Sequence, residues 1–243
     1  MGKLFVVGLG PGNPEAMTYA CRAALDQAEI LVGYDRYLAL AAPLYPDKPM
    51  LASGMTREVD RCRQALAQAA QGQTVALVCG GDAGVYGLAG LILELAEDYP
   101  PLEIEIIPGV TAALAGAALL GAALTHDFAV ISLSDLLTPW ALIEKRLAAA
   151  GEADFCIALY NPASRGRRDH LARAVRVLLR HKAPATLCGL ARQIGRPGQN
   201  TEILTLEALA GAEADMFTTV FIGNAATRRI RGRLVTPRGY TLD

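Results

Sequence analysis

The chain lacks a long hydrophobic run and an excess of charge of either sign. Its 243 residues carry 23 Lys and Arg against 24 Asp and Glu, for a formal net charge of −1. This balance gives no overall field that would attract nucleic acid or an anionic membrane. The apolar start, MGKLFVVGLGPG, is broken at once by glycine and proline, which leaves it too short for a signal peptide core or a membrane span. A polyanionic ligand would therefore need positive charge gathered locally.

Clustered cysteines are also missing, because none of the five forms a Cys-x-x-Cys pair or lies beside a histidine. They are Cys21, Cys62, Cys79, Cys156 and Cys188. An odd and scattered set argues against a disulfide framework and against a zinc site. We therefore expect reduced thiols in a cytoplasmic protein, with no bound metal.

Short runs rich in β-branched residues alternate with helical patterns along the whole chain. Strands are expected at 3–8, 74–79 and 103–107, and then at 128–132, 155–160, 186–190 and 219–222. Helices are expected at 17–28, 56–70, 85–98, 139–150 and 168–180, with a short one at 206–210. This alternation predicts an α/β fold in which helices flank mostly parallel sheets. The segment at 121–127 divides the two sets, so we predict domains at 1–121 and 122–243, with a ligand-binding crevice between them.

Three glycine-rich loops, each following an expected strand, are the candidate ligand-binding segments of the first predicted domain. The first is Gly8-Leu9-Gly10-Pro11-Gly12, which partly matches the glycine-rich fingerprint of a dinucleotide-binding site. That fingerprint needs glycine at its sixth position, where this chain has Asn13, and proline removes backbone donors that would cradle a pyrophosphate. A rigid turn that lets another molecule approach the backbone is the better interpretation.

The second and third loops repeat this arrangement. The residues 80–87 (GGDAGVYG) expose backbone groups and one carboxylate at the start of a helix. The residues 108–113 (PGVTAA) place Thr111 at another helix start, where an isolated threonine is usually an N-cap. A strand-end loop without any ligand remains the simpler alternative for each loop taken alone.

Together, in this order, the three loops resemble the tetrapyrrole methylase family, whose members methylate uroporphyrinogen and the precorrins with S-adenosyl-L-methionine. The resemblance covers essentially the whole chain. It implies a two-domain α/β fold with the active site in the interdomain cleft. The N-terminal domain would supply the substrate trough and part of the cofactor site, and the C-terminal domain would complete that site.

Within the family, the chain is most similar to the branch that methylates precorrin-3B at C(17). Most members have proline after the loop aspartate, but this chain has Ala83. Further similar stretches are 126–135 (HDFAVISLSD), 137–140 (LTPW), 160–165 (YNPASR), 192–196 (RQIGR) and 236–240 (TPRGY). The resemblance implies methylation with ring contraction to precorrin-4 in cobalamin biosynthesis. A cobalt-containing substrate or a different precorrin stays open as an alternative.

The resemblance also assigns residues to the cofactor and to the substrate. Its cofactor-binding positions are Gly80, Gly81, Asp82, Val85, Thr111, Ala112, Tyr160, Asn161, Ala191 and Gly223. S-adenosyl-L-homocysteine would be the product. The substrate carries eight carboxylates, which guanidinium groups bind well, and the loops offer Pro11, Arg165, Arg192 and Arg196 to border and hold it. Helix arginines from Arg168 to Arg180 are more typical of a solvated face.

Ring contraction, as the resemblance implies it, begins with deprotonation of a C(20) hydroxyl and so needs a general base. His126 and Asp135, with Asp127 between them in sequence, are candidates because they flank the expected crevice. His126 is equally compatible with an ordinary loop position, and His170 and His181 look like surface residues. Methyl transfer itself needs mainly positioning, since the sulfonium is already activated.

Rival functions remain open at this stage. A diphthine synthase-like enzyme, which methylates a protein side chain, would need a basic docking surface. A non-enzymatic nucleotide-binding module would need no substrate at all. We expect a tetrapyrrole as the small-molecule partner, a homodimer, and neither nucleic acid nor membrane as partners.

Overall fold

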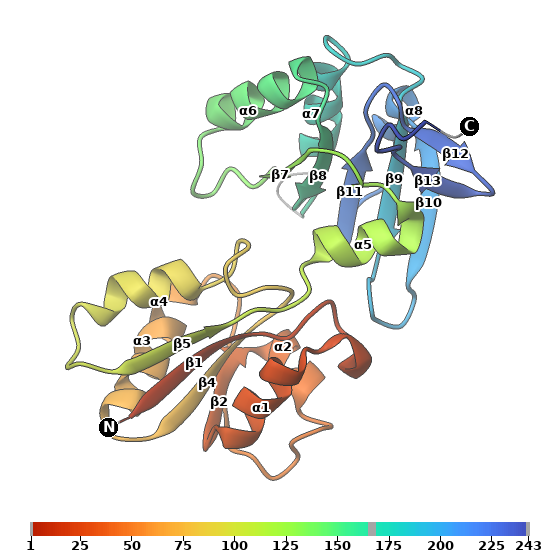
Figure 1. The fold of residues 1–243 in the computed structure, drawn as a ribbon. Coiled ribbons are helices and arrows are strands. Elements are labelled where there is room, and N and C mark those ends of the chain that lie inside the picture. The colour runs from red at the N-terminus through yellow and green to blue at the C-terminus, as the bar shows by residue number, and fades with distance from the viewer. Residues whose placement is uncertain (1, 165–168, 242–243) are drawn as a thin grey trace. The chain divides into compact units, whose positions relative to one another are not determined.

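The computed structural model describes residues 2–164 and 169–241, which fold into two compact units, Met1–Ala112 and Ala113–Asp243 (Figure 1). The first unit is built on a five-stranded sheet with the order β3-β2-β4-β1-β5. Its strands are β1 (Lys3–Gly8), β2 (Ile30–Tyr34), β3 (Met50–Ser53), β4 (Thr74–Cys79) and β5 (Glu103–Ile107). Every neighbouring pair is parallel, so all five strands end at one edge of the sheet.

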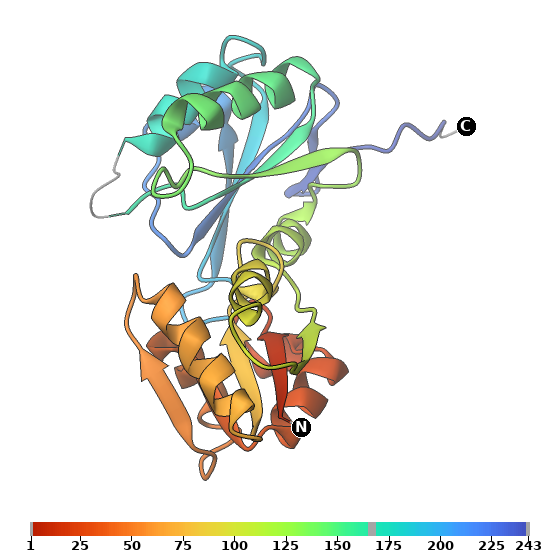
Figure 2. The ribbon, with the colours of Figure 1, turned by 90° about the vertical axis from the view of Figure 1, so that its left-hand side faces the viewer.

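Helices cover both faces of this sheet (Figures 1 and 2). They are η1 (Pro14–Ala16), α1 (Tyr19–Gln27), α2 (Asp35–Ala41), α3 (Glu58–Ala70) and α4 (Ala89–Ala96). Alternate residues of β1 separate the two faces: Leu4 and Val6 join the core under α3 and α4, whereas Phe5 and Val7 join the core under α1 and α2. A sheet buried on both faces explains the nearly continuous apolar runs of β1 and β4.

The second unit has a sheet of order β10-β9-β11-β8-β7. Its strands are β7 (Phe128–Ser132), β8 (Cys156–Tyr160), β9 (Leu187–Arg192), β10 (Asn200–Thr205) and β11 (Thr218–Ile222). The α/β class is confirmed, but this sheet is mixed rather than mostly parallel, since only β7 and β8 pair in parallel. The helix-linked strands β7, β8 and β9 do run in one direction. The short β9–β10 connection forces a reversal, and β11 inserts antiparallel between β8 and β9.

Helices pack on both faces of the second sheet as well. The helices α6 (Trp140–Glu152), α7 (His170–Leu178) and α8 (Leu206–Leu209) share a core with Val220 and Ile222 of β11. On the other face Gly116 of α5 (Ala112–Leu120) lies so close to Phe221 that an added Cβ would meet the ring at 2.8 Å. Because α5 packs on this sheet, the two compact units divide at 112/113.

A small three-stranded sheet joins distant parts of the second unit. Its order is β12-β13-β6, formed by β12 (Arg228–Ile230), β13 (Arg233–Val235) and β6 (Gly121–Ala122). The fully buried Thr236 follows β13 and donates from Oγ1 to the carbonyl of Ala123 at 3.0 Å. Thr125 in turn donates to the carbonyl of Thr236 at 2.6 Å. The last strand is thereby fixed to the segment that follows α5.

Across the described residues, every helix is too short or too polar to span a membrane.

Candidate functional site

The three glycine-rich loops of the first unit meet at the edge where its parallel strands end. Gly10 and Gly81 form a two-way backbone bridge, with N–H to O distances of 2.9 and 2.8 Å. Gly8 lies against Gly109, so an added Cβ at Gly8 would come within 2.7 Å of the Gly109 nitrogen. Loops that are far apart in the sequence therefore touch through their backbones.

This contact requires glycine. A Cβ at Gly109 would lie 2.1 Å from the carbonyl oxygen of Gly81 and 2.5 Å from that of Gly8, far inside contact distance. Gly81 also has φ of +68°, a conformation that side chains disfavour. The glycines thus make the junction of the loops possible.

The Asp82 carboxylate ties two of these loops together. Its Oδ1 accepts from the N–H groups of Gly84 and Val85 at 2.8 and 3.1 Å, and its Oδ2 accepts from the N–H of Gly109 at 2.9 Å. Such charge-assisted hydrogen bonds are among the stronger ones in proteins. The sequence predicted Asp82 as a cofactor contact, and the structure adds that it shapes the loop around itself.

The residues here fit an adenosyl cofactor, because at Gly81 and Gly84 the loop presents backbone that carries no side chain. A Cβ at Gly81 would meet nothing closer than the Thr111 Cα at 3.6 Å, and Gly84 is exposed. Gly80 is covered by the ring of Tyr37, and Val85 is half-buried. The structure thus brings together the predicted positions of the 80–85 loop and those at 111–112.

A second group of predicted positions lies in the second unit, at the edge where β7, β8 and β9 end. The Tyr160 hydroxyl accepts from the N–H of Ala113 at 2.8 Å, which fixes the end of β8 to the start of α5. Asn161 has φ of +53° and donates from Nδ2 to Ser132 Oγ at 2.9 Å. Ala191 is buried in β9.

Gly223 does not join this group. It follows β11, and its N–H donates to the carbonyl of Leu187 at the start of β9, at 2.9 Å. An all-parallel sheet would have brought Gly223 to the same edge as Tyr160, but β11 runs the other way. The antiparallel β11 instead brings its first residues, Thr218 and Thr219, beside Arg192 and Ala191, and the sequence did not indicate them.

The two candidate bases are separated by the length of β7. His126 precedes this strand and is exposed, and its Nδ1 accepts from the N–H of Asp127 at 2.8 Å. Asp135 follows the strand, on the side where Ser132 lies opposite Tyr160. Of the two, only Asp135 lies at the edge that carries Tyr160 and Asn161.

Sequence analysis missed His170, which was expected at the surface but is only 4% exposed. Its Nε2 lies 3.1 Å from Asp135 Oδ2, and its ring packs edge-on against Trp140 with centroids 4.9 Å apart. Arg173 covers the Trp140 ring at 3.9 Å. The apolar stripe of α7, which continues from His170 to Ala174 and Leu178, would have placed this histidine on the buried face. His181 is exposed, as expected.

The predicted substrate arginines differ in how they are engaged. Arg192 forms an ion pair with Glu202 at 2.9 Å and also donates to Asn200 and to the carbonyl of Glu213. Arg196 stacks over the ring of Phe217 at 5.3 Å. Arg165 falls outside the described residues, and Pro11 is half-buried in the first loop. The guanidinium of Arg192 is therefore already held by the protein itself.

All five cysteines are buried and unpaired. Burial raises the pKa of Cys21 and Cys79 to about 11 and that of Cys62 and Cys188 to about 12. These thiols are protonated at neutral pH, so they are packing residues and poor nucleophiles.

Comparison with known proteins shows which family and which solved structure this chain is similar to. The model of the tetrapyrrole (corrin/porphyrin) methylases matches residues 3–210. A probable cobalt-factor III C(17)-methyltransferase of Salmonella typhimurium is 48% identical over 240 residues, covering 98% of this chain and all of the relative. A precorrin-3B C(17)-methyltransferase of a Sinorhizobium species is 42% identical over 249 residues, covering 98% of this chain and 97% of the relative. The crystal structure of the methyltransferase CobJ superimposes with a TM-score of 0.91 at 40% identity, covering 98% of this chain and all of the other.

Proposed function

We propose that this chain, a member of the tetrapyrrole methylase family, acts on the cobalt-containing macrocycle cobalt-factor III. Its activity is that of an S-adenosyl-L-methionine-dependent C(17)-methyltransferase of cobalamin biosynthesis. The observation that supports the cobalt-containing substrate is the 48% identity to the Salmonella relative along its whole length, against 42% to the precorrin-3B enzyme. This differs from the sequence prediction, which favoured metal-free precorrin-3B. The loop motifs used for that prediction concern the cofactor and the ring, so they do not report on a metal at the centre of the ring.

S-adenosyl-L-methionine supplies an activated methyl group on its sulfonium, so the protein needs mainly to position it. In the first unit, the 80–85 loop and Thr111 would hold the cofactor through backbone groups, with Asp82 keeping the loop in shape. In the second unit, Tyr160, Asn161 and Ala191 are the proposed contacts. We leave Gly223 out of this set, because it lies at the other end of β11.

Methyl transfer to a ring carbon needs no strong base, but ring contraction does. We propose that Asp135 removes the proton from the C(20) hydroxyl when precorrin-3B is the substrate, in the role for which the sequence also offered His126. The placement of Asp135 after β7, beside the buried His170, supports this choice. Asp135 would accept the proton directly, and His170 would fix the orientation of its carboxylate.

The test is to supply the purified enzyme with cobalt-factor III and with precorrin-3B in parallel, with isotope-labelled S-adenosyl-L-methionine. We expect label at C(17) of the cobalt macrocycle, with kcat/KM at least about 10-fold above that for precorrin-3B. Mass spectrometry of the products reports methylation and contraction separately. Turnover of precorrin-3B alone would overturn the cobalt assignment while leaving the C(17)-methyltransferase activity intact.

A further inference from the structure

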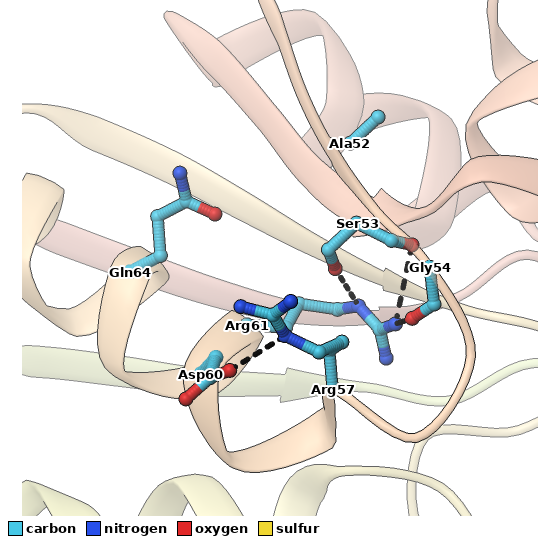
Figure 3. Close-up of a pocket in the computed structure, with 7 residues that line it drawn as sticks. All are labelled: Ala52, Ser53, Gly54, Arg57, Asp60, Arg61 and Gln64. Atoms are coloured by element: carbon cyan, nitrogen blue, oxygen red, sulfur yellow. Dashed lines mark hydrogen bonds and ion pairs between the residues drawn. The ribbon is translucent and has the colours of Figure 1, made fainter.

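A hollow of about 460 Å³ lies at the carboxyl end of β3, and Figure 3 shows the side chains around it. They come from the end of β3 and the first turns of α3: Ala52, Ser53, Gly54, Arg57, Asp60, Arg61 and Gln64. Because the sheet is parallel, β3 ends at the same edge as β1 and β4, which carry the glycine-rich loops. In the strand order β3 lies two strands from β4, roughly 10 Å away.

Arg61 is a buried cation without an anionic partner. It is only 4% exposed, yet its hydrogen bonds go to neutral groups: Nε donates to Ser53 Oγ at 2.8 Å, and Nη2 donates to the carbonyls of Gly54 and Ser53 at 2.8 and 3.4 Å. Within 2–164 and 169–241 the Arg61 side chain forms no ion pair, and its Nη1 makes no hydrogen bond. Figure 3 shows the bonds that its other two nitrogens make to Ser53 and Gly54. A buried charge is costly unless an opposite charge compensates it.

Arg57 adds a second guanidinium at the rim of the hollow. Its side chain is 65% exposed, and only its Nε is engaged, with Asp60 Oδ2 at 2.7 Å. Neither terminal nitrogen of Arg57 has a hydrogen bond within the described chain. Two arginines and one aspartate line the hollow, so its lining carries one net positive charge. Terminal guanidinium nitrogens in such a place suit the two oxygens of a carboxylate.

We propose that this hollow is a binding subsite for a carboxylate on a peripheral side chain of the tetrapyrrole substrate, held directly by Arg57 and Arg61. The inference rests on the proposed function, because a tetrapyrrole with acid side chains supplies carboxylates several ångströms from the reacting carbon. The hollow accepts one acid side chain while the macrocycle lies nearer the glycine-rich loops. It also compensates the charge of Arg61, which the protein alone leaves without an anion. The sequence indicated neither arginine, since it drew attention only to later ones.

A purely structural role for Arg61 is the competing explanation. Its hydrogen bonds connect the end of β3 to α3, and that alone would explain its burial. Such a role makes no demand on Arg57, whose terminal nitrogens make no hydrogen bond within the described chain. The exposed Arg57 is therefore the residue that separates the two explanations, and its replacement leaves the core intact.

The experiment measures binding of uroporphyrin, a tetrapyrrole with eight carboxylates, by its absorbance change in the presence of S-adenosyl-L-homocysteine. We expect Arg57→Gln to weaken binding about 10-fold, as loss of one charge-assisted hydrogen bond predicts. Arg61→Lys keeps the positive charge but loses the planar guanidinium that can donate two hydrogen bonds to one carboxylate, so it should also weaken binding about 10-fold. Arg63→Gln, an exposed arginine of the same helix outside the hollow, is the matched control and should bind as wild type. Calorimetric affinity for S-adenosyl-L-homocysteine should not change in any variant.

Two results would overturn the subsite. Arg57→Gln could bind uroporphyrin as tightly as wild type, or Arg63→Gln could weaken binding as much as Arg57→Gln, which would indicate only general surface charge. If Arg61→Lys fails to fold, Arg57→Gln still decides. Because the assay needs no turnover, a failure of the proposed C(17) activity would leave this result interpretable.

Discussion

Asp82 was predicted to contact the cofactor directly, but in the structure its carboxylate holds the shape of the glycine-rich loop. A carboxylate in a loop at a strand end suggests direct contact with a ligand, and the sequence supports no more than that. In the structure both of its oxygens accept from backbone N–H groups, one of them 27 residues further along the chain. This partner, Gly109, could not be predicted, because the pairing depends on how the strands are arranged in space. The effect of Asp82 on the cofactor is therefore expected to act through the loop.

We predict that Asp82→Ala weakens binding of S-adenosyl-L-homocysteine by at least about 10-fold, since it removes charge-assisted hydrogen bonds that shape the cofactor loop. Asp82→Asn keeps one acceptor oxygen and should lose less. Isothermal calorimetry measures the affinity. The control is Asp98→Ala, which replaces an exposed aspartate in the turn after α4. Unchanged affinity in Asp82→Ala would remove this residue from the site.

A second prediction at this scale concerns the proposed base. With precorrin-3B as substrate, Asp135→Asn should slow ring contraction by about 10²–10⁴-fold while methylation proceeds, because only contraction needs proton removal. A methylated, uncontracted macrocycle should then accumulate and be visible by mass. His126→Gln should contract at the normal rate, since His126 lies at the opposite end of β7. Equal loss of both steps in Asp135→Asn would instead indicate a positioning role.

The elements themselves were predicted well where their signal is local. β1, β4, β5 and β7 match the expected ranges. Each is a run rich in β-branched residues that is ended by glycine, proline or serine, so both ends of the strand can be predicted. Strands β2, β3 and β10 of the two five-stranded sheets were missed. The sequence of β10, NTEILT, is largely polar, because the strand lies at a sheet edge. Strand direction in the second sheet was not predictable either, since the insertion of β11 depends on pairing between residues far apart in sequence. That reversal also explains why Gly223 lies away from Tyr160 and Asn161, which were predicted to bind the cofactor with it.

The junction of the three loops leads to a prediction about whole elements. Gly109→Ala should lower the free energy of unfolding by about 1–3 kcal/mol, because its Cβ would force the Gly81 and Gly8 carbonyls apart. Cofactor affinity should fall with it. Gly90→Ala has open space around it in α4, and should raise stability by about 0.5–1 kcal/mol. Urea unfolding of both variants is the measurement, and equal stability of the two would contradict the close approach of the loops.

On the scale of the whole molecule, the family followed from the order of three loops, and the α/β class followed from the alternation of strand and helix patterns. Gly116 of α5 packs against Phe221 of the second sheet, and the domains at 1–121 and 122–243 stay a prediction. Whether the domains divide the substrate trough and the cofactor site as expected stays a prediction, as do the assembly and the cytoplasmic location. Helix packing of this kind is set by side chains that meet only after folding.

We predict that the enzyme is a homodimer in solution, as expected from the sequence. Exposed apolar side chains of the second unit, Leu136 and Leu137 among them, are available for such a contact. Sedimentation equilibrium should give twice the chain mass at micromolar concentration. Leu137→Asp should shift the equilibrium toward monomer if this surface takes part, and a wild-type protein that sediments as a monomer would contradict the prediction.

The pairing of β13 with β6 has a consequence for synthesis of the protein. All strands of the first sheet are present once residue 112 has been made, so this unit can fold while translation continues. The second unit must wait, because β6 and the Ala123 carbonyl find their partners in β13 and Thr236, more than a hundred residues later. Until these residues leave the ribosome, β6 has no partner strand and the hydrogen bonds of the small sheet cannot form.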